Sequence, residues 1–307
     1  MDKIEVAEMR ESPRGRSMLN LYKQCPRKWA FKYIKGFQPQ GKQDPLTLGS
    51  SIHEAQALFY NGATLAEVTN FLGDFLEDSP HLLRKAHAMF MAWYDIIGIH
   101  DKDNMIPLAV EVEAPLKLHN GYTMTVRWDR VLLERNGGEI FINDTKTTGG
   151  SLLKTIQNYN YSDQPKLYIA SVLQSQPEWL KQFRGWRTDC IRGFESKGKY
   201  TTGNITTEVK RSEIVSFTPE EIEDTLIGYS VLTDDIKFKV QSVIEGGEPI
   251  RAHFYDTSDF CLSFGRVCPF KTICHQIDHI EEPPANMEID PWVKKGTVIN
   301  TFLEDGK

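Results

Sequence analysis

The sequence predicts an α/β or α+β core with a helical N-terminal lobe. Apolar residues recur with helical spacing through most of the first third of the chain, whereas alternation with a period of two dominates residues 106–147. Helical spacing returns over residues 162–173 and 219–244. Strands enclosed by helices in this order are typical of such a core, with helices packed on a sheet.

The N-terminal helices are predicted from their apolar stripes. One stripe runs from Met18 to Trp29, and Pro26 within it should break or restart the helix. Further helices are expected over residues 48–60, 64–77 and 82–97.

Five strands are expected in the middle of the chain. The first three cover residues 106–118, 122–134 and 139–147, and the turns Asn120-Gly121 and Asn136-Gly137-Gly138 between them indicate an antiparallel meander. The other two cover residues 183–196 and 205–217. The domain organisation expected from these elements is a helical lobe (1–105), a core (106–245), a cysteine-bearing segment (246–280) and an extended tail (281–307).

Composition excludes several classes of protein. With 40% hydrophobic and 25% charged residues in 307, the chain can bury a sizeable core and is not expected to be disordered. It has no N-terminal apolar run of signal-peptide length and no stretch of 18 uncharged apolar residues. We therefore expect a cytoplasmic protein, in the host cell if the gene is viral, without membrane contact. Five scattered cysteines do not suggest a disulfide framework, and metal ligation is the alternative use.

Basic residues gather near the N-terminus although the net charge is -6. Nine of them against a single acid lie between residues 10 and 42: Arg10, Arg14, Arg16, Lys23, Arg27, Lys28, Lys32, Lys35 and Lys42. The segment is either an ordinary solvated face or a phosphate-binding surface. In the second case Arg27 and Lys28 would contact phosphates, and Trp29, Phe31 and Tyr33 would stack on bases unless they belong to the core.

A carboxylate and a lysine share one strand face. Asp144 and Lys146 are two residues apart, so both side chains point to one side of the strand, and the preceding hairpin could bring Asp129 to them. Two carboxylates would bind a hard divalent cation, and a nearby lysine would orient or deprotonate a water, which is the chemistry of phosphodiester hydrolysis. Taken alone, the Asp-x-Lys triplet is more typical of an exposed ion pair.

Two further pairs strengthen the hydrolytic interpretation. Gln164 and Tyr168 would share a helical face after the Asp-x-Lys strand, and Gly49 precedes His53 by four residues on a predicted helix. By itself, His53 would more often be a core or surface histidine.

The ordered series of Gly49 and His53, Asp129, Asp144 and Lys146, and Gln164 and Tyr168 resembles the motifs of RecB-like exonucleases in the PD-(D/E)XK superfamily. The resemblance covers roughly residues 17 to 170 and implies a restriction-endonuclease-like fold, with a central mixed sheet flanked by helices. It implies Mg²⁺ or Mn²⁺ as cofactor, with ligands from His53, Asp129, Asp144 and the Thr145 carbonyl. It also implies catalytic roles for Asp129, Asp144, Lys146, Gln164 and Tyr168, the last two contacting the scissile strand or bracing the site.

Four cysteines form a second constellation, with Cys25 early in the chain and Cys261, Cys268 and Cys274 near its end. Four thiolates suffice for one [4Fe-4S] cluster or one Zn²⁺, although buried cysteines often bind nothing. The arrangement is similar to the iron-sulfur subgroup of these nucleases, including CRISPR-associated adaptation nucleases and AddB-type subunits. The resemblance therefore implies a [4Fe-4S] cluster, with zinc as the alternative, while Cys190 is expected to be an ordinary buried residue.

The function expected from these motifs is that of a metal-dependent DNA exonuclease acting on single-stranded or free DNA ends, in recombination, repair or phage DNA processing. The chain lacks a Walker A motif, so a helicase or recombinase would be a separate partner. The alternatives are a catalytically weak iron-sulfur or zinc DNA-binding module, a structural protein with a zinc staple, and a restriction-type endonuclease.

Overall fold

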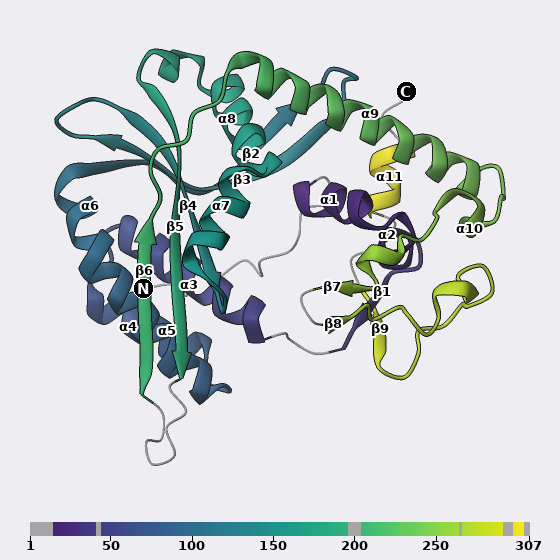
Figure 1. Cartoon of the computed structure of the whole chain (residues 1–307), viewed down its shortest axis with the longest axis horizontal. Coiled ribbons are helices and arrows are strands. Elements are labelled where there is room, and N and C mark those ends of the chain that lie inside the picture. Colours follow the sequence, from purple (N-terminus) through teal and green to yellow (C-terminus); the bar gives the residue numbers. More distant parts are fainter. Residues whose placement is uncertain (1–14, 41–43, 196–203, 264–265, 291–296, 304–307) are drawn as a thin grey trace. The chain divides into compact units, whose positions relative to one another are not determined.

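The computed structural model describes residues 15–40, 44–195, 204–263, 266–290 and 297–303 (Figure 1). The chain divides into two compact units whose segments alternate along the sequence. The first unit comprises residues 1–41, 117–125 and 226–307, and the second comprises residues 42–116 and 126–225.

A five-stranded sheet in the order β2-β3-β4-β5-β6 organises the second unit. The strands are β2 (Met105–Lys117), β3 (Thr123–Glu134), β4 (Ile140–Thr148), β5 (Phe183–Glu195) and β6 (Ile205–Arg211). β3 runs antiparallel to β4, β5 runs parallel to β4, and β6 runs antiparallel to β5. The sheet is therefore mixed, as expected.

Helices cover both faces of this sheet (Figure 1). They are α3 (Asp44–Tyr60), α4 (Leu65–Phe75), α5 (Pro80–Trp93), α6 (Ile99–Asn104), α7 (Leu152–Asn160) and α8 (Asp163–Ser175). α3, α4 and α5 enclose an apolar core that includes Ile191 of β5. On the opposite face of β5, Thr188 donates to Asn160 of α7 and Trp186 contacts Tyr168 of α8. The predicted α+β class is confirmed, and the arrangement is consistent with a restriction-endonuclease-like fold.

Several elements of the second unit differ from the sequence prediction. The helix expected over residues 82–97 ends at Trp93 and continues as a π-helical turn, Tyr94–Gly98, in which Gly98 leaves room for the Trp93 ring. The strand expected over residues 205–217 ends at Arg211, and Val215 rejoins Trp186 only through an isolated bridge. α7 was not predicted, and a short 3₁₀ turn, Pro177–Lys181, follows α8.

The first unit is built around aromatic side chains. Pro26 begins α2, as predicted, and the Trp29 ring stacks on Phe254 with centroids 5.5 Å apart. The helices of this unit are α1 (Arg16–Gln24), α2 (Pro26–Tyr33), most of α9 (Pro219–Ile244), α10 (Ile250–His253) and α11 (Thr297–Leu303). Its strands are β1 (Phe37–Pro39), β7 (Leu262–Ser263), β8 (Arg266–Val267) and β9 (Met287–Ile289), with 3₁₀ turns at Ser258–Phe260 and Cys274–Gln276.

The segment 281–307, expected to be an extended tail, contains two regular elements. β9 pairs antiparallel with β1, and α11 supplies Phe302, which is buried against Trp29 and Tyr122. These contacts hold the end of the described chain to the rest of the first unit. Within the described residues, no helix combines the length and apolar character that a membrane span requires.

The close approach of Gly185 to Val215 gives a stability prediction. Gly185 has φ 142°, and a Cβ added there would lie 2.3 Å from the Val215 carbonyl oxygen. We expect Gly185→Ala to lower the free energy of unfolding by at least about 2 kcal/mol, because backbone strain and a clash with main chain add together. Urea unfolding followed by circular dichroism measures this change.

Gly73→Ala is the matched control in the same unit, because Gly73 lies in α4 with nothing near its added Cβ. It should raise stability by up to about 1 kcal/mol, the helix-propensity difference. Equal effects of the two substitutions would contradict the assigned contact at Gly185.

Candidate functional site

Helix α3 brings His53 to the sheet. Gly49, one turn earlier on α3, lies next to β4, and an added Cβ would lie 3.4 Å from the Thr147 hydroxyl oxygen, an ordinary van der Waals distance. The structure therefore gives no steric reason for glycine at this position.

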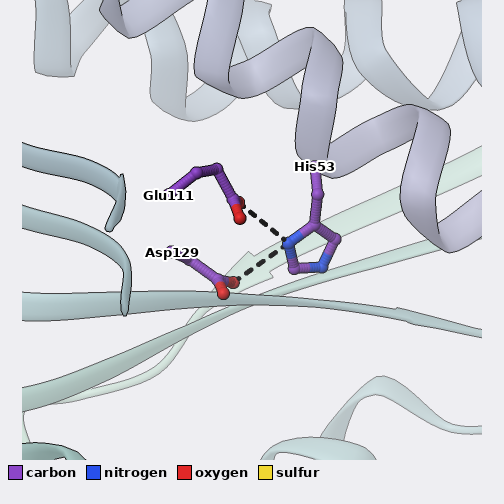
Figure 2. Close-up of side chains that lie close together, drawn as sticks. All are labelled: His53, Glu111 and Asp129. Carbon is purple, nitrogen blue, oxygen red and sulfur yellow. Dashed lines mark ion pairs between the residues drawn. The ribbon is translucent and has the colours of Figure 1, made fainter. Parts of the chain in front are cut away.

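His53 lies between two carboxylates (Figure 2). Its Nδ1 is 3.2 Å from Asp129 Oδ2 and 3.5 Å from Glu111 Oε1, and one donor atom of each residue lies within 4.8 Å of the others. Burial opposes the charged imidazole, but Asp129 and Glu111 outweigh burial and raise the pKa of His53 to about 9. The three residues thus offer two oxygen donors and one nitrogen donor, a set that fits Mg²⁺ or Mn²⁺.

Glu111 was not found by sequence reasoning. It is the one non-glycine residue with positive φ, 49°, among the described residues, and this left-handed backbone turns its side chain toward His53. In the sequence, Glu111 and Glu113 occupy equivalent positions of an alternating strand, yet Glu113 pairs with Arg127 instead at 2.8 Å. No local signal distinguishes the two glutamates, because the difference arises from an irregular backbone conformation.

Asp144 and Lys146 lie together on β4, as the strand period predicts. The Lys146 Nζ is 2.7 Å from Asp144 Oδ2, and Gln164 Nε2 donates to Asp144 Oδ1 over 2.9 Å. Burial and the Asp129 charge raise the pKa of Asp144 to about 6, although Lys146 acts in the opposite direction. The structure therefore joins Asp144 to Lys146 and Gln164, beside the cluster of His53, Glu111 and Asp129.

Lys146 is held as a cation. Burial disfavours its ammonium form, but Asp144 and Asp129 outweigh burial and raise the pKa of Lys146. Its Nζ also lies 4.7 Å from the centre of the Tyr159 ring on α7, a contact that the sequence did not predict because α7 itself was not predicted. A protonated Lys146 donates hydrogen bonds and does not accept a proton.

Two further expected residues, Thr145 and Tyr168, make contacts within the second unit. The Thr145 amide donates to Asp129 Oδ2 over 2.8 Å, which links β4 to β3 at the carboxylate that also faces His53. Tyr168 lies one turn after Gln164 on α8, and its ring meets the edge of Trp186 with centroids 5.6 Å apart.

The four predicted cysteine ligands line one cavity in the first unit. The Cys25 thiol caps α2, where its Sγ accepts from the Lys28 amide at 3.4 Å. Cys261 and Cys268 face each other at the base of the β7–β8 hairpin, where the Cys268 amide donates to the Cys261 carbonyl over 2.8 Å. Together with Cys274 these are free thiols, so the donor set fits a four-thiolate metal site. Cys190 is fully buried, as expected.

Part of the basic N-terminal segment is not available for the DNA contacts expected of it. Arg27 is buried, and its Nε donates to the Phe254 carbonyl over 2.8 Å, so this guanidinium is not available for phosphate. Trp29, Phe31 and Tyr33 are fully or almost fully buried and belong to the core, which contradicts their use as stacking surfaces. Arg10, Arg14 and Lys42 lie outside the described residues.

Comparisons with known proteins show to which family the chain belongs. No curated protein matches the chain. A solved structure titled "Crystal structure of SSO0001" matches 74% of this chain and 83% of its own, with 13% identity and a TM-score of 0.27, which is too low to support an argument. The PD-(D/E)XK nuclease superfamily, whose members are metal-dependent nucleases, matches residues 16–275. Because this match spans most of the chain, the protein belongs to the PD-(D/E)XK nuclease superfamily.

Proposed function

We propose that the chain is a divalent-metal-dependent DNA exonuclease that acts on single-stranded or free DNA ends, in recombination, repair or phage DNA processing. A separate helicase or recombinase would present such ends to it. The observation that carries the proposal is the adjacency of two groups on one sheet, the donor cluster of His53, Glu111 and Asp129 and the buried Asp144–Lys146 pair. The first group suits a cation and the second suits a reacting phosphate.

The residues proposed to hold the metal come from four elements of the second unit. His53 of α3, Glu111 of β2 and Asp129 of β3 face one another, and Asp144 with the Thr145 carbonyl of β4 would complete the set. Imidazole among carboxylates permits Mg²⁺ and favours Mn²⁺. When bound, such an ion lowers the pKa of a water ligand and stabilises negative charge on the phosphate.

The other site residues would orient the reacting groups and balance their charge. Lys146, held as a cation by Asp144, would donate to the attacking water or to a phosphate oxygen. Gln164 fixes the Asp144 carboxylate from the opposite oxygen. Tyr168 would brace the site or contact the scissile strand.

We further propose that Cys25, Cys261, Cys268 and Cys274 hold a [4Fe-4S] cluster, with Zn²⁺ as the alternative, in a structural role. The support is that four free thiols from distant parts of the sequence line one cavity. A metal centre there would fix the start of α2 to the hairpin and the 3₁₀ turn of the C-terminal segment.

Substitutions at the catalytic pair test the activity. Asp144→Asn and Lys146→Met should each reduce the rate of label release from end-labelled single-stranded DNA at least about 100-fold with Mn²⁺ or Mg²⁺, because each removes a charge from the reaction centre. Glu178→Gln, an exposed carboxylate of the 3₁₀ turn after α8, should keep wild-type activity. Discrete internal products from duplex DNA would instead indicate a restriction-type endonuclease, and an inactive, folded wild type would indicate a binding module.

Glu111 and Glu113 form a matched pair for testing the metal ligands. Glu111→Gln should weaken Mn²⁺ binding at least about tenfold in calorimetric titration, because it removes one oxygen charge from the cluster. Glu113→Gln, two residues along the same strand and paired with Arg127, should leave the affinity unchanged. A loss in both variants, or in neither, would exclude Glu111 as a ligand.

Metal analysis of anaerobically purified protein tests the four-cysteine site. The wild type should be brown and contain iron and labile sulfide, whereas Cys25→Ser should lose both because three thiolates hold the cluster poorly. Cys190→Ala is the control in the other unit and should keep the colour. Colourless wild type with one zinc per chain would identify the alternative metal, and wild type without either metal would refute the site.

A further inference from the structure

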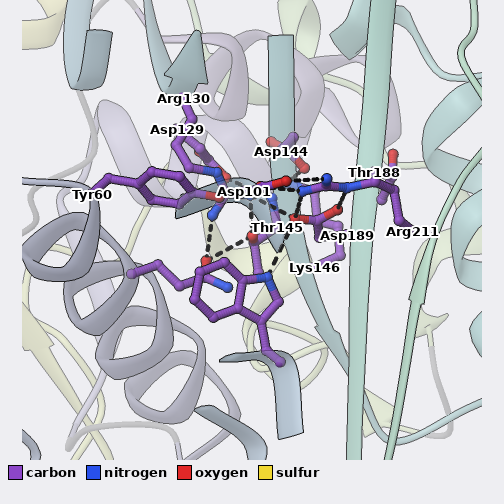
Figure 3. A network of polar contacts seen from close by, with 12 residues as sticks. Tyr60, Asp101, Asp129, Arg130, Asp144, Thr145, Lys146, Thr188, Asp189 and Arg211 are labelled. Atoms are coloured by element: carbon purple, nitrogen blue, oxygen red, sulfur yellow. Dashed lines mark hydrogen bonds and ion pairs between the residues drawn. The ribbon is translucent and has the colours of Figure 1, made fainter. Parts of the chain in front are cut away.

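A buried polar network lies on the sheet face that α3 and α5 cover, next to the proposed metal ligands (Figure 3). Arg130 of β3 is at its centre, with its side chain 2% exposed. It directly follows Asp129 in the sequence, and both side chains have a partner on α3, His53 for Asp129 and Gln56 for Arg130. The guanidinium is buried and bonded within the network, so it is not available to a phosphate.

The guanidinium of Arg130 joins three secondary-structure elements. It donates to Gln56 Oε1 of α3 and to Thr145 Oγ1 of β4, both over 2.7 Å, and to Asp189 Oδ2 of β5 over 3.2 Å. The Thr145 hydroxyl also donates to Gln56 Oε1 over 2.7 Å, which closes a triangle of hydrogen bonds.

Each partner in this triangle is adjacent to a proposed metal ligand. Gln56 lies three residues after His53 on α3, so the two side chains share one helical face. Thr145 lies beside Asp144 on β4, and its amide is bonded to Asp129. The triangle therefore ties together α3, β3 and β4, which carry the proposed ligands except Glu111.

The charge of Arg130 is balanced within the network. Asp189 accepts from Arg130 and also from Arg211 Nε of β6, over 2.7 Å. Arg211 in turn forms two hydrogen bonds of 2.7 Å with Asp101 of α6. Two arginines and two aspartates thus neutralise one another in the interior, which is the condition for burying them without a large electrostatic cost.

We propose that Arg130 is a positioning residue of the metal site, which sets the spacing between the helix that bears His53 and the strands that bear Asp129 and Asp144. The inference rests on the proposed function of these ligands as a metal site. A buried ion pair is weak evidence for stability, since apolar residues of similar volume often stabilise a protein equally well. Arginine is suited to fixing geometry, because its planar fork directs several donors at once, which a lysine does not do.

Binding of Mn²⁺ to folded variants of the full chain separates positioning from stability. Arg130→Lys keeps the charge and loses the fork, and we expect it to weaken Mn²⁺ binding about 10- to 100-fold, the scale for groups that orient metal ligands. Arg211→Lys is the matched control, because it alters the distant half of the network without a bond to Gln56 or Thr145. It should destabilise the fold. At temperatures below its unfolding transition, it should keep the wild-type affinity for Mn²⁺.

Gln56→Met provides a second variant in case Arg130→Lys does not fold. It preserves the side-chain length and removes the acceptor that Arg130 and Thr145 share, so it should also weaken Mn²⁺ binding. In both variants kcat for DNA cleavage at a fixed subsaturating Mn²⁺ concentration should fall while KM for DNA stays near the wild-type value, because the network does not face the substrate.

The result that overturns the inference is wild-type Mn²⁺ affinity in folded Arg130→Lys and Gln56→Met, or an equal loss in Arg211→Lys. Wild type that binds Mn²⁺ but does not cut DNA would refute the proposed nuclease function, while weaker binding in the two variants would still support the positioning role. Wild type that binds no Mn²⁺ would refute both.

Discussion

The hydrogen bond from the Thr145 amide to Asp129 is the contact on which the proposed nuclease site depends. It ties β3 to β4 at the carboxylate that also faces His53 on α3, so one oxygen fixes two strands and a helix. The backbone amide is a donor that no substitution at Thr145, except proline, removes. Asp144 is the residue that precedes Thr145 on β4, so the same junction lies beside the Asp144–Lys146 pair.

The charges gathered at this junction explain why a cation would suit the site. Asp129, Glu111 and Asp144 lie close together, and the structure offsets them with a proton on His53 and the ammonium of Lys146. The pKa of His53 is raised to about 9 and that of Asp144 to about 6, both in the direction that reduces net negative charge. A divalent ion can replace the imidazole proton and relieve the same repulsion.

Periodicity alone predicted the parts of the site that lie on regular elements. Alternation placed Asp144 beside Lys146, and helical spacing placed Gln164 and Tyr168 on α8. It failed at Glu111, where a left-handed residue breaks the alternation, and at the Arg130 network, whose bonds join residues up to 110 positions apart along the chain. The mixed sheet came from the family resemblance, since the parallel pairing of β4 with β5 is set by the crossover through α7 and α8 and has no signature in the strands themselves.

The count of basic residues near the N-terminus was misleading at Arg27, because this arginine is buried and bonds a backbone carbonyl. In the second unit, Arg130 and Arg211 pair with aspartates, and Lys146 pairs with Asp144. A phosphodiester entering the site would therefore meet carboxylates whose charge these cations do not fully offset, and like charges repel strongly where water is excluded. Under the proposed function, metal binding must precede the productive binding of DNA, because the ion is what makes the site attractive to a phosphate.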